Sequence, residues 1–364
     1  MTPDRNQTVK DYVAAFEGRP ASDFISNLET RVTTLRWGAH VLPVTVNDGT
    51  AGRTFVCSPR VGWIDFTKEE LARFPKKWLV PPLAAVITAM GALLRLCDLN
   101  RIVHINNWMM STNLPVDLDT SLVPAQTKML IETYPDHFLA MRSLNRRHSG
   151  ATMNALEDAG WIFFPSRQIF ILDDVPNQYM TQTDSKKDEK LWHKTSYEYE
   201  EIGTLTNNDA NRIAALYARL YIDKYSQLNP QYSASFIKLA HELKFLRFLA
   251  LRDGQGTIQA FGAFHRLGNH GTMPLLGYNT DLPAKEGLYR LACHAGSRYA
   301  AAHGLHLNKS SGATLFKRNR GATPEMEYTA FYIKHLSRRR RAPFGILQLV
   351  SKHIAIPILE KYQL

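Results

Sequence analysis

A short glycine-containing turn is the first place where residue types and spacing suggest chemistry. Residues 285–290 read Lys-Glu-Gly-Leu-Tyr-Arg and stand between a strand pattern and a long helical pattern. Such a turn presents unpaired backbone N–H groups at the start of the next helix, where the helix dipole adds positive potential. These groups favour an anion such as a pyrophosphate, and Lys285 and Arg290 add cationic contacts. The other interpretation is an ordinary helix N-terminus with solvated charges.

A second polar stretch lies in the first half of the chain. Residues 105–115 (INNWMMSTNLP) follow a strand pattern and hold three asparagines, a serine, a threonine and a tryptophan. This composition predicts a polar-rimmed pocket with an aromatic wall, formed by Asn107, Trp108, Ser111 and Asn113. The alternative is that the asparagines cap turns locally. Arg142, in the run MRSLNRR, is a candidate partner for a carboxylate or phosphate.

The remaining nucleophilic and titratable residues give weaker signals. His265 and His270 flank a turn between two expected strands and are either base candidates or edge histidines. Cys57, Cys97 and Cys293 are far apart and odd in number, so neither a disulfide framework nor a zinc site is expected. Cys293 is expected to be a buried apolar residue. No metal site is predicted.

A regular order of elements would position these residues. The second half predicts a strand, two helices, three strands, a long helix, a strand, a short helix and a last strand (197–205, 207–225, 233–243, 245–253, 258–267, 272–279, 286–303, 305–310, 315–319 and 327–333). The first half predicts strands at 39–46, 101–106, 138–144 and within 161–173, with helices at 82–97, 124–134 and 150–159. Antiparallel hairpins combined with a helical crossover predict an α/β or α+β class with a mixed sheet. The two halves have loosely similar orders, which allows a duplicated fold.

Length and composition predict two domains. The chain has 364 residues, of which 45% are hydrophobic and 21% charged, as in globular proteins with more than one core. The polar stretch 182–194 is expected to be a linker between residues 1–181 and 195–337, with a tail at 338–364. No apolar run approaches about 18 uninterrupted residues, so no membrane-spanning helix is expected. The polar N-terminus and the dispersed cysteines predict a cytoplasmic protein.

The stretch from residue 275 to 322 resembles the GNAT acyltransferase superfamily, and within it the FemAB-like acetyltransferase branch. It runs from a strand through a loop into a long helix ending at 301–304 (AAHG). A strand ending in Ser310-Ser311-Gly312 follows, and then Lys317-Arg318 before Gly321-Ala322. The resemblance covers roughly residues 197–335. It implies a GNAT-like fold for the second half, and the similar order of the first half extends this to two tandem GNAT-like domains.

The resemblance implies that acetyl-CoA or another acyl-CoA is the co-substrate. It places cofactor contacts at Leu276, Asn279, Lys285, Gly287, Leu288 and Arg290. A backbone N–H in 276–278 would polarise the thioester carbonyl. A tyrosine would protonate the leaving thiolate. The candidates are Tyr278, Tyr328 and Tyr332, of which Tyr278 and Tyr332 are preferred. Ser310 and Lys317 complete a substrate-binding set with Asn107, Trp108, Ser111, Asn113 and Arg142.

The leading prediction is CoA-dependent N-acylation of a small-molecule or amino-acid-like amine. The net charge of +11 favours an anionic partner. An alternative enzyme is a tRNA-dependent aminoacyl transferase of the FemAB type, which needs a basic track for RNA. A third interpretation is a non-catalytic fold that binds an anionic ligand, because the turn at 285–290 keeps only one glycine.

The C-terminal residues 338–364 combine an arginine run (338–341) with a strongly apolar segment. One interpretation is a helix that docks on the first domain and is interrupted at Pro357. The other is peripheral contact with an anionic membrane, because a polybasic stretch beside an apolar helix binds such a surface.

Overall fold

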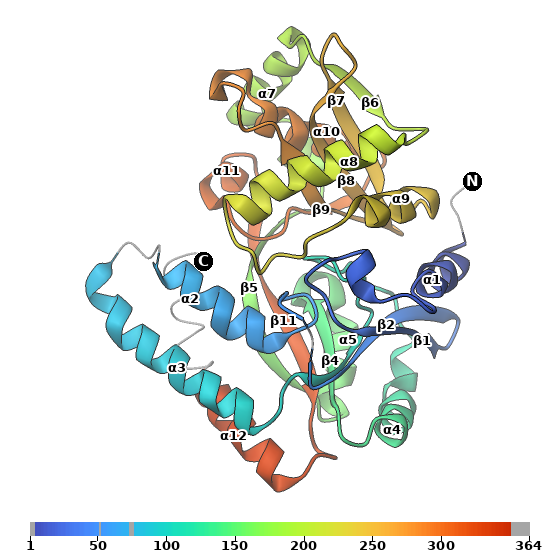
Figure 1. The fold of residues 1–364 in the computed structure, drawn as a ribbon, viewed down its shortest axis with the longest axis vertical. Helices are drawn as coiled ribbons and strands as arrows, with labels where there is room; N and C mark the ends of the chain where they lie inside the picture. The colour runs from blue at the N-terminus through green and yellow to red at the C-terminus, as the bar shows by residue number, and fades with distance from the viewer. Residues whose placement is uncertain (1–3, 51, 73–75, 351–364) are drawn as a thin grey trace.

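One mixed sheet runs through the whole molecule. The computed structural model describes residues 4–50, 52–72 and 76–350. Its sheet has the strand order β1-β2-β3-β4-β11-β5-β10-β9-β8-β7-β6 and extends through both lobes (Figure 1), so the mixed α/β class is confirmed. The strands are β1 (Arg31–Trp37), β2 (His40–Asp48), β3 (Arg101–Ile105), β4 (Phe138–Leu144), β5 (Ile162–Leu172), β6 (Glu198–Glu201), β7 (Arg247–Arg252), β8 (Ile258–Leu267), β9 (His270–Tyr278), β10 (His306–Asn308) and β11 (Thr323–Tyr332).

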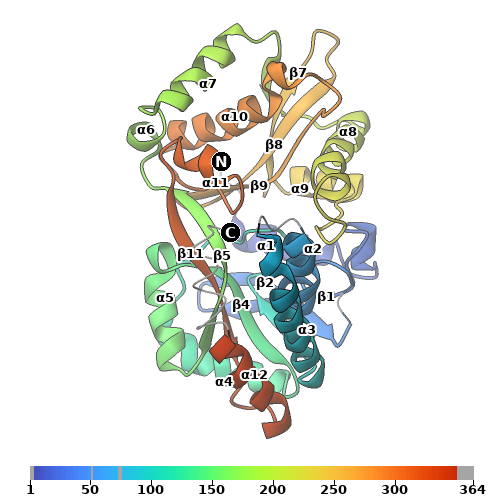
Figure 2. The same ribbon diagram turned by 90° about the vertical axis from the view of Figure 1, so that its left-hand side faces the viewer.

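In each lobe, helices lie on both faces of the sheet (Figures 1 and 2). Ser233 opens α9 as the sequence predicts, because its hydroxyl accepts the backbone N–H of Phe236. The helices are α1 (Arg5–Ala14), α2 (Thr67–Ala72), α3 (Val80–Leu96), α4 (Val123–Thr133), α5 (Arg146–Asp158), α6 (Val175–Gln178), α7 (Thr183–Lys194), α8 (Asn207–Tyr217), α9 (Ala234–Glu242), α10 (Leu288–Ala302), α11 (Thr314–Arg318) and α12 (Arg338–Val350). Short 3-10 or π turns lie at Ala21–Asp23, Val61–Phe66, Lys77–Leu79, Thr120–Leu122, Ala218–Asp223 and Ala284–Glu286.

The same unit occurs in each half. In the first half β2 and β3 pair antiparallel, and the chain then passes through α4 to β4, which is parallel to β3. In the second half β8 and β9 pair antiparallel, and the chain passes through α10 to β10, which is parallel to β9. An antiparallel pair followed by a helical crossover is thus repeated along the chain. This repeat accounts for the similar element orders of the two halves.

Each half gives its last strand to the other half. β5 follows β4 in sequence but pairs with β10, whereas β11 follows β10 and pairs with β4. β5 and β11 also pair with each other along most of their length, from Thr323 opposite Ile171 to Phe331 opposite Ile162. These two strands run between the lobes in Figure 2. The halves therefore interlock, and a cut near residues 182–194 would separate strands that pair.

The polar stretch expected as a linker is helix α7. Its buried Ser185 and Asp188, and its partly buried Leu191 and Trp192, share one face that packs on α10. Spacings of three and four residues place these side chains on one side of a helix. The sequence pattern did not predict this helix, because its central buried side chain is the carboxylate of Asp188 and not an apolar group.

A shared apolar core joins the lobes. Tyr12 of α1 and Trp108, both from the first half, pack against Phe245 of the second half with ring centroids 5.1 and 5.3 Å away. The cluster continues into α8, α9, β7 and β8. Burial of aromatic side chains on this scale favours a fixed relation between the lobes.

Helix α3 lies at the edge of the first lobe. Residues Lys77–Leu96 have a mean hydropathy of 1.8 and are long and apolar enough to cross a membrane by length and composition. This finding concerns length and composition only, so the expectation that no helix spans a membrane stays a prediction. The sequence test required an uninterrupted apolar run, and Thr88 and Gly91 interrupt this one.

Candidate active site

The parallel strands β9 and β10 separate part-way along β9. They pair only from His270 opposite His306 to Thr272 opposite Asn308. After Asn308 the chain follows β5, since Lys309 donates its backbone N–H to Phe170. Among the described strands, the rest of β9 pairs with β8 alone. Alternate backbone amides on this part of β9 therefore face the opening between the strands. Leu276, a predicted cofactor contact, lies here and is buried.

The turn before α10 is shaped by a glycine. Gly287 has a φ of +69° and caps the helix, and a Cβ at this position would lie 2.5 Å from Leu191 Cδ2 of α7. The amides of the first helical turn have no partner within the helix. Asn279 is engaged elsewhere, because its Oδ1 accepts from Arg219 and its Nδ2 donates to Gln259.

The other predicted cofactor residues have three different environments. Lys285 is exposed, whereas Leu288 is buried among apolar residues of β9 and α10. Arg290 donates its Nε to Asp188 Oδ1 at 2.6 Å. The Nε that the sequence offered to a phosphate is therefore already held by a carboxylate.

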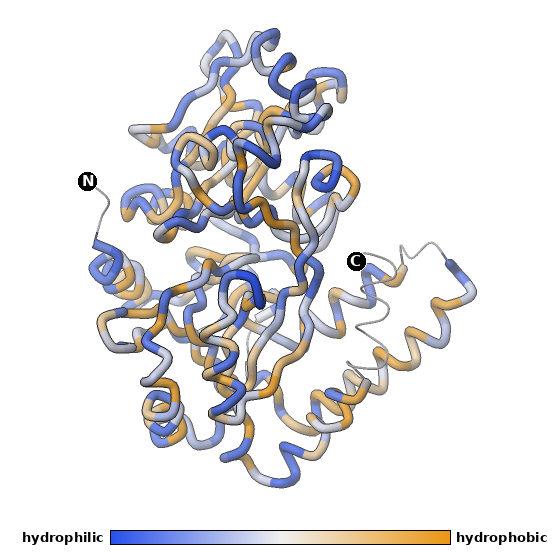
Figure 3. The backbone as a smooth tube through the Cα atoms, turned by 180° about the vertical axis from the view of Figure 1, so that it is seen from behind, coloured by the Kyte–Doolittle hydropathy of each residue, from blue (hydrophilic) through white to orange (hydrophobic). Residues whose placement is uncertain are grey.

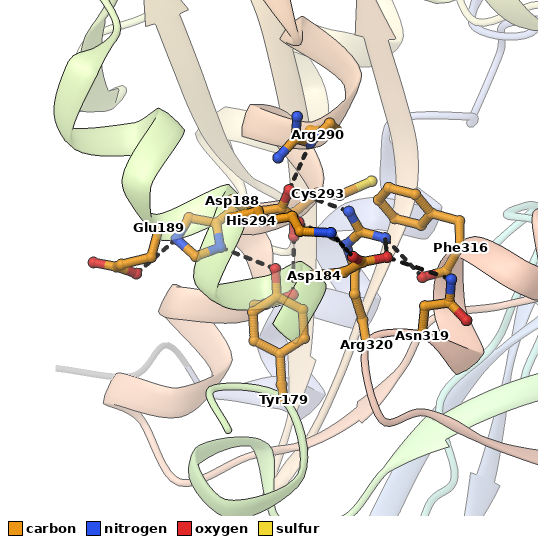
Figure 4. Close-up of polar contacts among 12 residues, drawn as sticks. Tyr179, Asp184, Asp188, Glu189, Arg290, Cys293, His294, Phe316, Asn319 and Arg320 are labelled. Atoms are coloured by element: carbon orange, nitrogen blue, oxygen red, sulfur yellow. Dashed lines mark hydrogen bonds and ion pairs between the residues drawn. The ribbon is translucent and has the colours of Figure 1, made fainter. Parts of the chain in front are cut away.

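An ionic network ties α7 to α10 and to the segment after α11 (Figure 4). Asp188 is 1% exposed and accepts from Arg290 Nε and from Arg320 Nε, each at 2.6 Å. The neighbouring Glu189 contacts His294 Nε2 at 2.9 Å, and Tyr179 Oη lies 2.9 Å from His294 Nδ1. The network positions helices around the β9–β10 opening. Cys293 of α10 is buried as predicted, and burial raises the pKa of its thiol.

Two lysines are enclosed beside the opening. Lys309 Nζ donates to Ser297 Oγ at 3.0 Å, and Lys317 Nζ donates to the carbonyl oxygens of Ser310 at 3.0 Å and Ser311 at 2.5 Å. Within residues 4–50, 52–72 and 76–350 neither ammonium has a carboxylate ion-pair partner. Burial, followed by the charge of Lys309, lowers the pKa of Lys317 to about 7. Burial also lowers the pKa of Lys309.

Loops from the two halves meet at Arg167 of β5. Its Nε contacts Glu327 Oε1 of β11 at 2.9 Å, and its Nη2 donates to Ser111 O at 2.7 Å and Thr112 Oγ1 at 2.9 Å. Thr112 in turn donates to Ser310 Oγ at 3.1 Å. Two stretches that the sequence predicted separately as substrate-binding are thus in contact.

We call this region the seam. It comprises the loop after β3, the loop after β10 and the charged residues that join them: residues 106–113, Arg142, Arg167, residues 309–313, Lys317 and Glu327. Its position follows from the exchange of β5 and β11, which brings the ends of β3 and β10 together in the middle of the sheet.

Backbone strain concentrates at the seam and in the adjoining strand β4. Asn106, Met109, Ser143, Ser310 and Ala313 have φ values from 48° to 63°. They are five of the seven non-glycine residues with positive φ in the described part of the chain. This conformation costs about 1–3 kcal/mol for a non-glycine residue and is typical of binding and catalytic sites. The contacts of Lys317 with Ser310 and Ser311 help to hold the second loop.

The substrate residues predicted in the first half divide into two groups. Asn107 is fully buried, and its Oδ1 accepts from Arg142 Nη1 at 3.2 Å, so Asn107 orients the guanidinium. Trp108 is 2% exposed and packs in the shared core, so it is not the wall of an open pocket. Asn113 accepts the backbone N–H of Trp108, as the turn-capping alternative expects.

Several buried polar atoms in and beside the seam have no hydrogen-bond partner among the residues that the structure describes. They are Asn106 Oδ1, Trp108 Nε1, Asn113 Nδ2 and, on β9, Thr272 Oγ1. Buried polar groups are usually satisfied, so such a group is where a water or a ligand atom is expected.

The two predicted catalytic tyrosines lie in separate clusters. Tyr278 ends β9 and its ring centroid is 6.0 Å from that of Tyr289. Tyr332 ends β11 and packs on Trp161 and His335 in the first-half core. The structure does not bring these tyrosines together, because β11 crosses into the first half.

The two histidines proposed as bases also differ in position. His265 is 2% exposed, its Nδ1 lies 2.7 Å from the carbonyl oxygen of Phe245, and burial lowers its pKa to about 4. His270 stands at the start of β9, at the end of the strand opposite the opening, beside His148 and His306. Neither histidine is therefore placed to act as a base at the β9–β10 opening.

Sequence reasoning missed Lys309, Arg167 and Glu327. Lys309 directly precedes the Ser310-Ser311-Gly312 motif, so its position was a usable signal. Arg167 and Glu327 are 160 residues apart and meet only through the β5–β11 pairing. No local pattern marks such a pair.

No protein-family model matches this chain, and no curated protein matches it. Among solved structures it is similar to L-PGS from Bacillus licheniformis, with 13% identity, a TM-score of 0.47, and coverage of 65% of this chain and 79% of that one. For FemX the identity is 8%, the TM-score 0.45 and the coverage 64% and 80%. For a GCN5-related N-acetyltransferase from Kribbella flavida the values are 12%, 0.35, 64% and 81%.

Proposed function

We propose that this protein is an acyltransferase that acylates the amine of a small anionic acceptor in the seam. The observation that carries the proposal is the buried ammonium of Lys317, which donates to the carbonyl oxygens of Ser310 and Ser311 and has no carboxylate partner among the described residues. Burial lowers the pKa of Lys317 to about 7. A base of this pKa is well matched to taking a proton from an amine near neutral pH.

The hydrogen bonds of Lys317 suit that role. A neutral amine has two N–H bonds and one lone pair, and the carbonyl oxygens of Ser310 and Ser311 can accept both N–H bonds. The lone pair is then left to accept the proton. The acceptor nitrogen attacks the acyl carbonyl, the bond to the leaving group breaks, and the proton passes to Lys317.

The β9–β10 opening supports an acyl-CoA donor. Free amides on the unpaired edge of β9 near Leu276 would polarise a thioester carbonyl, and the first turn of α10 would face the pyrophosphate. Lys285 is exposed and open to a phosphate contact. Tyr278, at the end of β9, remains our candidate for protonating the thiolate. Tyr332 packs elsewhere and is not part of this proposal.

Charge at the seam supports an anionic acceptor. Among the described residues, one carboxylate forms an ion pair with the seam cations Arg142, Arg167, Lys309 and Lys317. It is Glu327, which pairs with Arg167. Such an excess of cations in a partly enclosed site favours a carboxylate or phosphate on the acceptor. This fits an amino-acid-like molecule whose amine is acylated.

Calorimetry of the full chain with acetyl-CoA, longer acyl-CoAs and bulk tRNA tests the donor. Saturable binding of a CoA thioester is the expected result. Salt-dependent binding of tRNA without CoA binding would favour the aminoacyl-tRNA alternative, which the net charge of +11 supports. Binding of acyl-CoA without turnover of any amine would favour a non-catalytic binding protein.

We also propose that the face formed by α3 and α12 rests on an anionic lipid surface. Only 17% of the apolar window in Lys77–Leu96 is buried. Trp78, Leu96, Ile346 and Leu349 are 49–73% exposed and account for four of the seven exposed large hydrophobic residues in the described chain. An apolar face of this kind marks an interaction surface.

The charges around this face match a bilayer. Arg340 donates to the carbonyl oxygens of Cys97 and Asp98, which sets the arginine run 338–341 at the end of α3. Arg95 is exposed at the same end, and Lys77 and Trp78 stand at the other. Figure 3 shows apolar residues along α3. A helix with cationic ends and an apolar middle is suited to lie in the interface between a membrane and water. The part of the tail at 351–364, including Pro357, lies outside the described residues.

The double variant Ala85→Glu, Ala89→Glu is expected to weaken binding to anionic vesicles at least about tenfold. Both alanines are exposed on α3, so folding should be retained while charge enters the lipid-facing side. Vesicle flotation measures the loss. The matched control Ala125→Glu, Thr133→Glu adds the same charge on α4 and should bind like the parent. Equal binding by all three proteins, or a change from dimer to monomer in the α3 variant, would overturn the proposal.

A further inference from the structure

Histidines from three elements gather where β9 and β10 begin. His306 is the first residue of β10, His270 the first of β9, and His148 lies in the first turn of α5. Asp173 follows β5 and lies among them, with its Oδ1 2.8 Å from His148 Nε2 and 3.6 Å from His306 Nδ1. The ligand atoms of His148, Asp173 and His306 all lie within 4.8 Å of one another.

The ring spacings match those of a tetrahedral metal centre. Zinc lies about 2.0–2.1 Å from a histidine nitrogen, which sets imidazole centroids about 5 Å apart around one ion. The centroid of His148 is 4.7 Å from that of His270 and 5.4 Å from that of His306, and the last two are 5.3 Å apart. Three imidazoles at this spacing, with a carboxylate close to two of them, His148 and His306, form a ligand set that a transition metal prefers to magnesium or calcium.

The surroundings already orient the carboxylate. Arg147 pairs with Asp173 Oδ2, whereas His148 and His306 lie near Oδ1, and it also donates to Thr323 Oγ1 at 2.6 Å. Arg147 therefore holds the carboxylate through the oxygen that does not face these two histidines. The backbone carbonyl of Asp173 lies 3.0 Å from His306 Nδ1. Outer contacts of this kind fix ligand orientation in metal sites and raise affinity.

We propose that His148, Asp173, His306 and His270 bind one divalent transition-metal ion of the zinc class. The ion would join α5 and the end of β5 to the first residues of β9 and β10, and so fasten the two interlocked halves. The site lies at the opposite end of β9 from the opening, so its role is structural and independent of the proposed acyl transfer. All four positions are held by the folded chain, so metal binding stabilises the folded state.

The test uses the full chain, stripped with a chelator and titrated with Co²⁺ and then Zn²⁺. We expect one Co²⁺ per chain with the intense visible absorption of tetrahedral cobalt, its displacement by Zn²⁺, and a higher Tm with zinc. Neither readout depends on enzyme activity. Absence of the cobalt band in the parent protein overturns the proposal without any variant.

Variants assign the ligands. The double variant His148→Ala, His306→Ala should lose the cobalt band, and His270→Ala should weaken binding at least about tenfold. The control His193→Ala removes an exposed histidine that pairs with Glu189 on α7 and should bind like the parent. Undiminished binding by the double variant, or unchanged affinity in His270→Ala, overturns the four-residue site.

Discussion

Replacing Lys317 with methionine is expected to lower kcat/KM for acyl transfer at least about 100-fold, as loss of a general base does. The side chain is 6% exposed and has no ion-pair partner among the described residues, so an apolar residue of similar length should be accepted without unfolding. Steady-state kinetics with the donor identified by calorimetry measure the loss. Lys186→Met, on the exposed side of α7, is the control and should leave activity unchanged.

The pH profile separates a base from a residue that only holds the loop. Burial lowers the pKa of Lys317 to about 7, so the neutral amine, and with it the rate, should rise as the pH increases through 7. Lys317→Arg keeps the charge and can still donate to Ser310 and Ser311, but it does not deprotonate. This variant should lose activity, and its remaining rate should no longer rise as the pH increases through 7. A parent rate that is flat between pH 6 and about 8 would contradict the assignment.

Local patterns were enough to predict the crossover units. The apolar periodicity of 286–303 and the alternating strands before it correspond to α10 (Leu288–Ala302), β8 and β9. The predicted helix 82–97 corresponds to α3 (Val80–Leu96). Hydrophobic periodicity reports which side of an element is buried, and in these elements one side faces the sheet. The prediction of residues 207–225 as one helix was longer than α8, which gives way to a π turn after Tyr217.

Pairing between distant strands was beyond the reach of such patterns. The alternation in β5 and β11 shows that these strands are buried, but it does not say which strand lies beside them. The exchange between halves places Arg167 and Glu327 in the seam and takes Tyr332 out of it. Local sequence patterns therefore pointed to the part of the proposed site that lies on one loop, Ser310 and Lys317, but not to the part that depends on the topology.

In the proposed reaction, both halves of the chain contribute residues to the seam. The first half supplies Arg142, oriented by Asn107, and the backbone carbonyl of Ser111, which holds Arg167. The second half supplies Lys309, Lys317 and the opening beside β9. If each half had a site of its own, the loops that carry the strained residues Asn106 and Ser310 would have no reason to contact each other. In the structure the two loops contact each other, because Thr112 donates a hydrogen bond to Ser310. This contact helps to stabilise the strained backbone of both loops.

Replacing Asp188 with alanine is expected to lower the free energy of unfolding by about 3–5 kcal/mol, the cost of breaking a buried ion pair. Asp188 is 1% exposed, and its loss leaves Arg320, 6% exposed, without its closest carboxylate and frees Arg290. Urea denaturation measures the change. If residues 182–194 were only a linker between domains, as their composition suggested, this substitution would cost almost nothing.

The control for this prediction lies on the same helix. Asp184 is 28% exposed and contacts Arg320 only at 3.9 Å, so Asp184→Ala should cost less than about 1 kcal/mol, as for other surface pairs. Equal, small effects at both positions would show that α7 contributes little to the fold. A large loss at Asp188 alone would identify this carboxylate as the contact that fixes α7 over Gly287 and the first turn of α10. We would then expect the same variant to weaken binding of the donor, because the proposed pyrophosphate site lies at that turn.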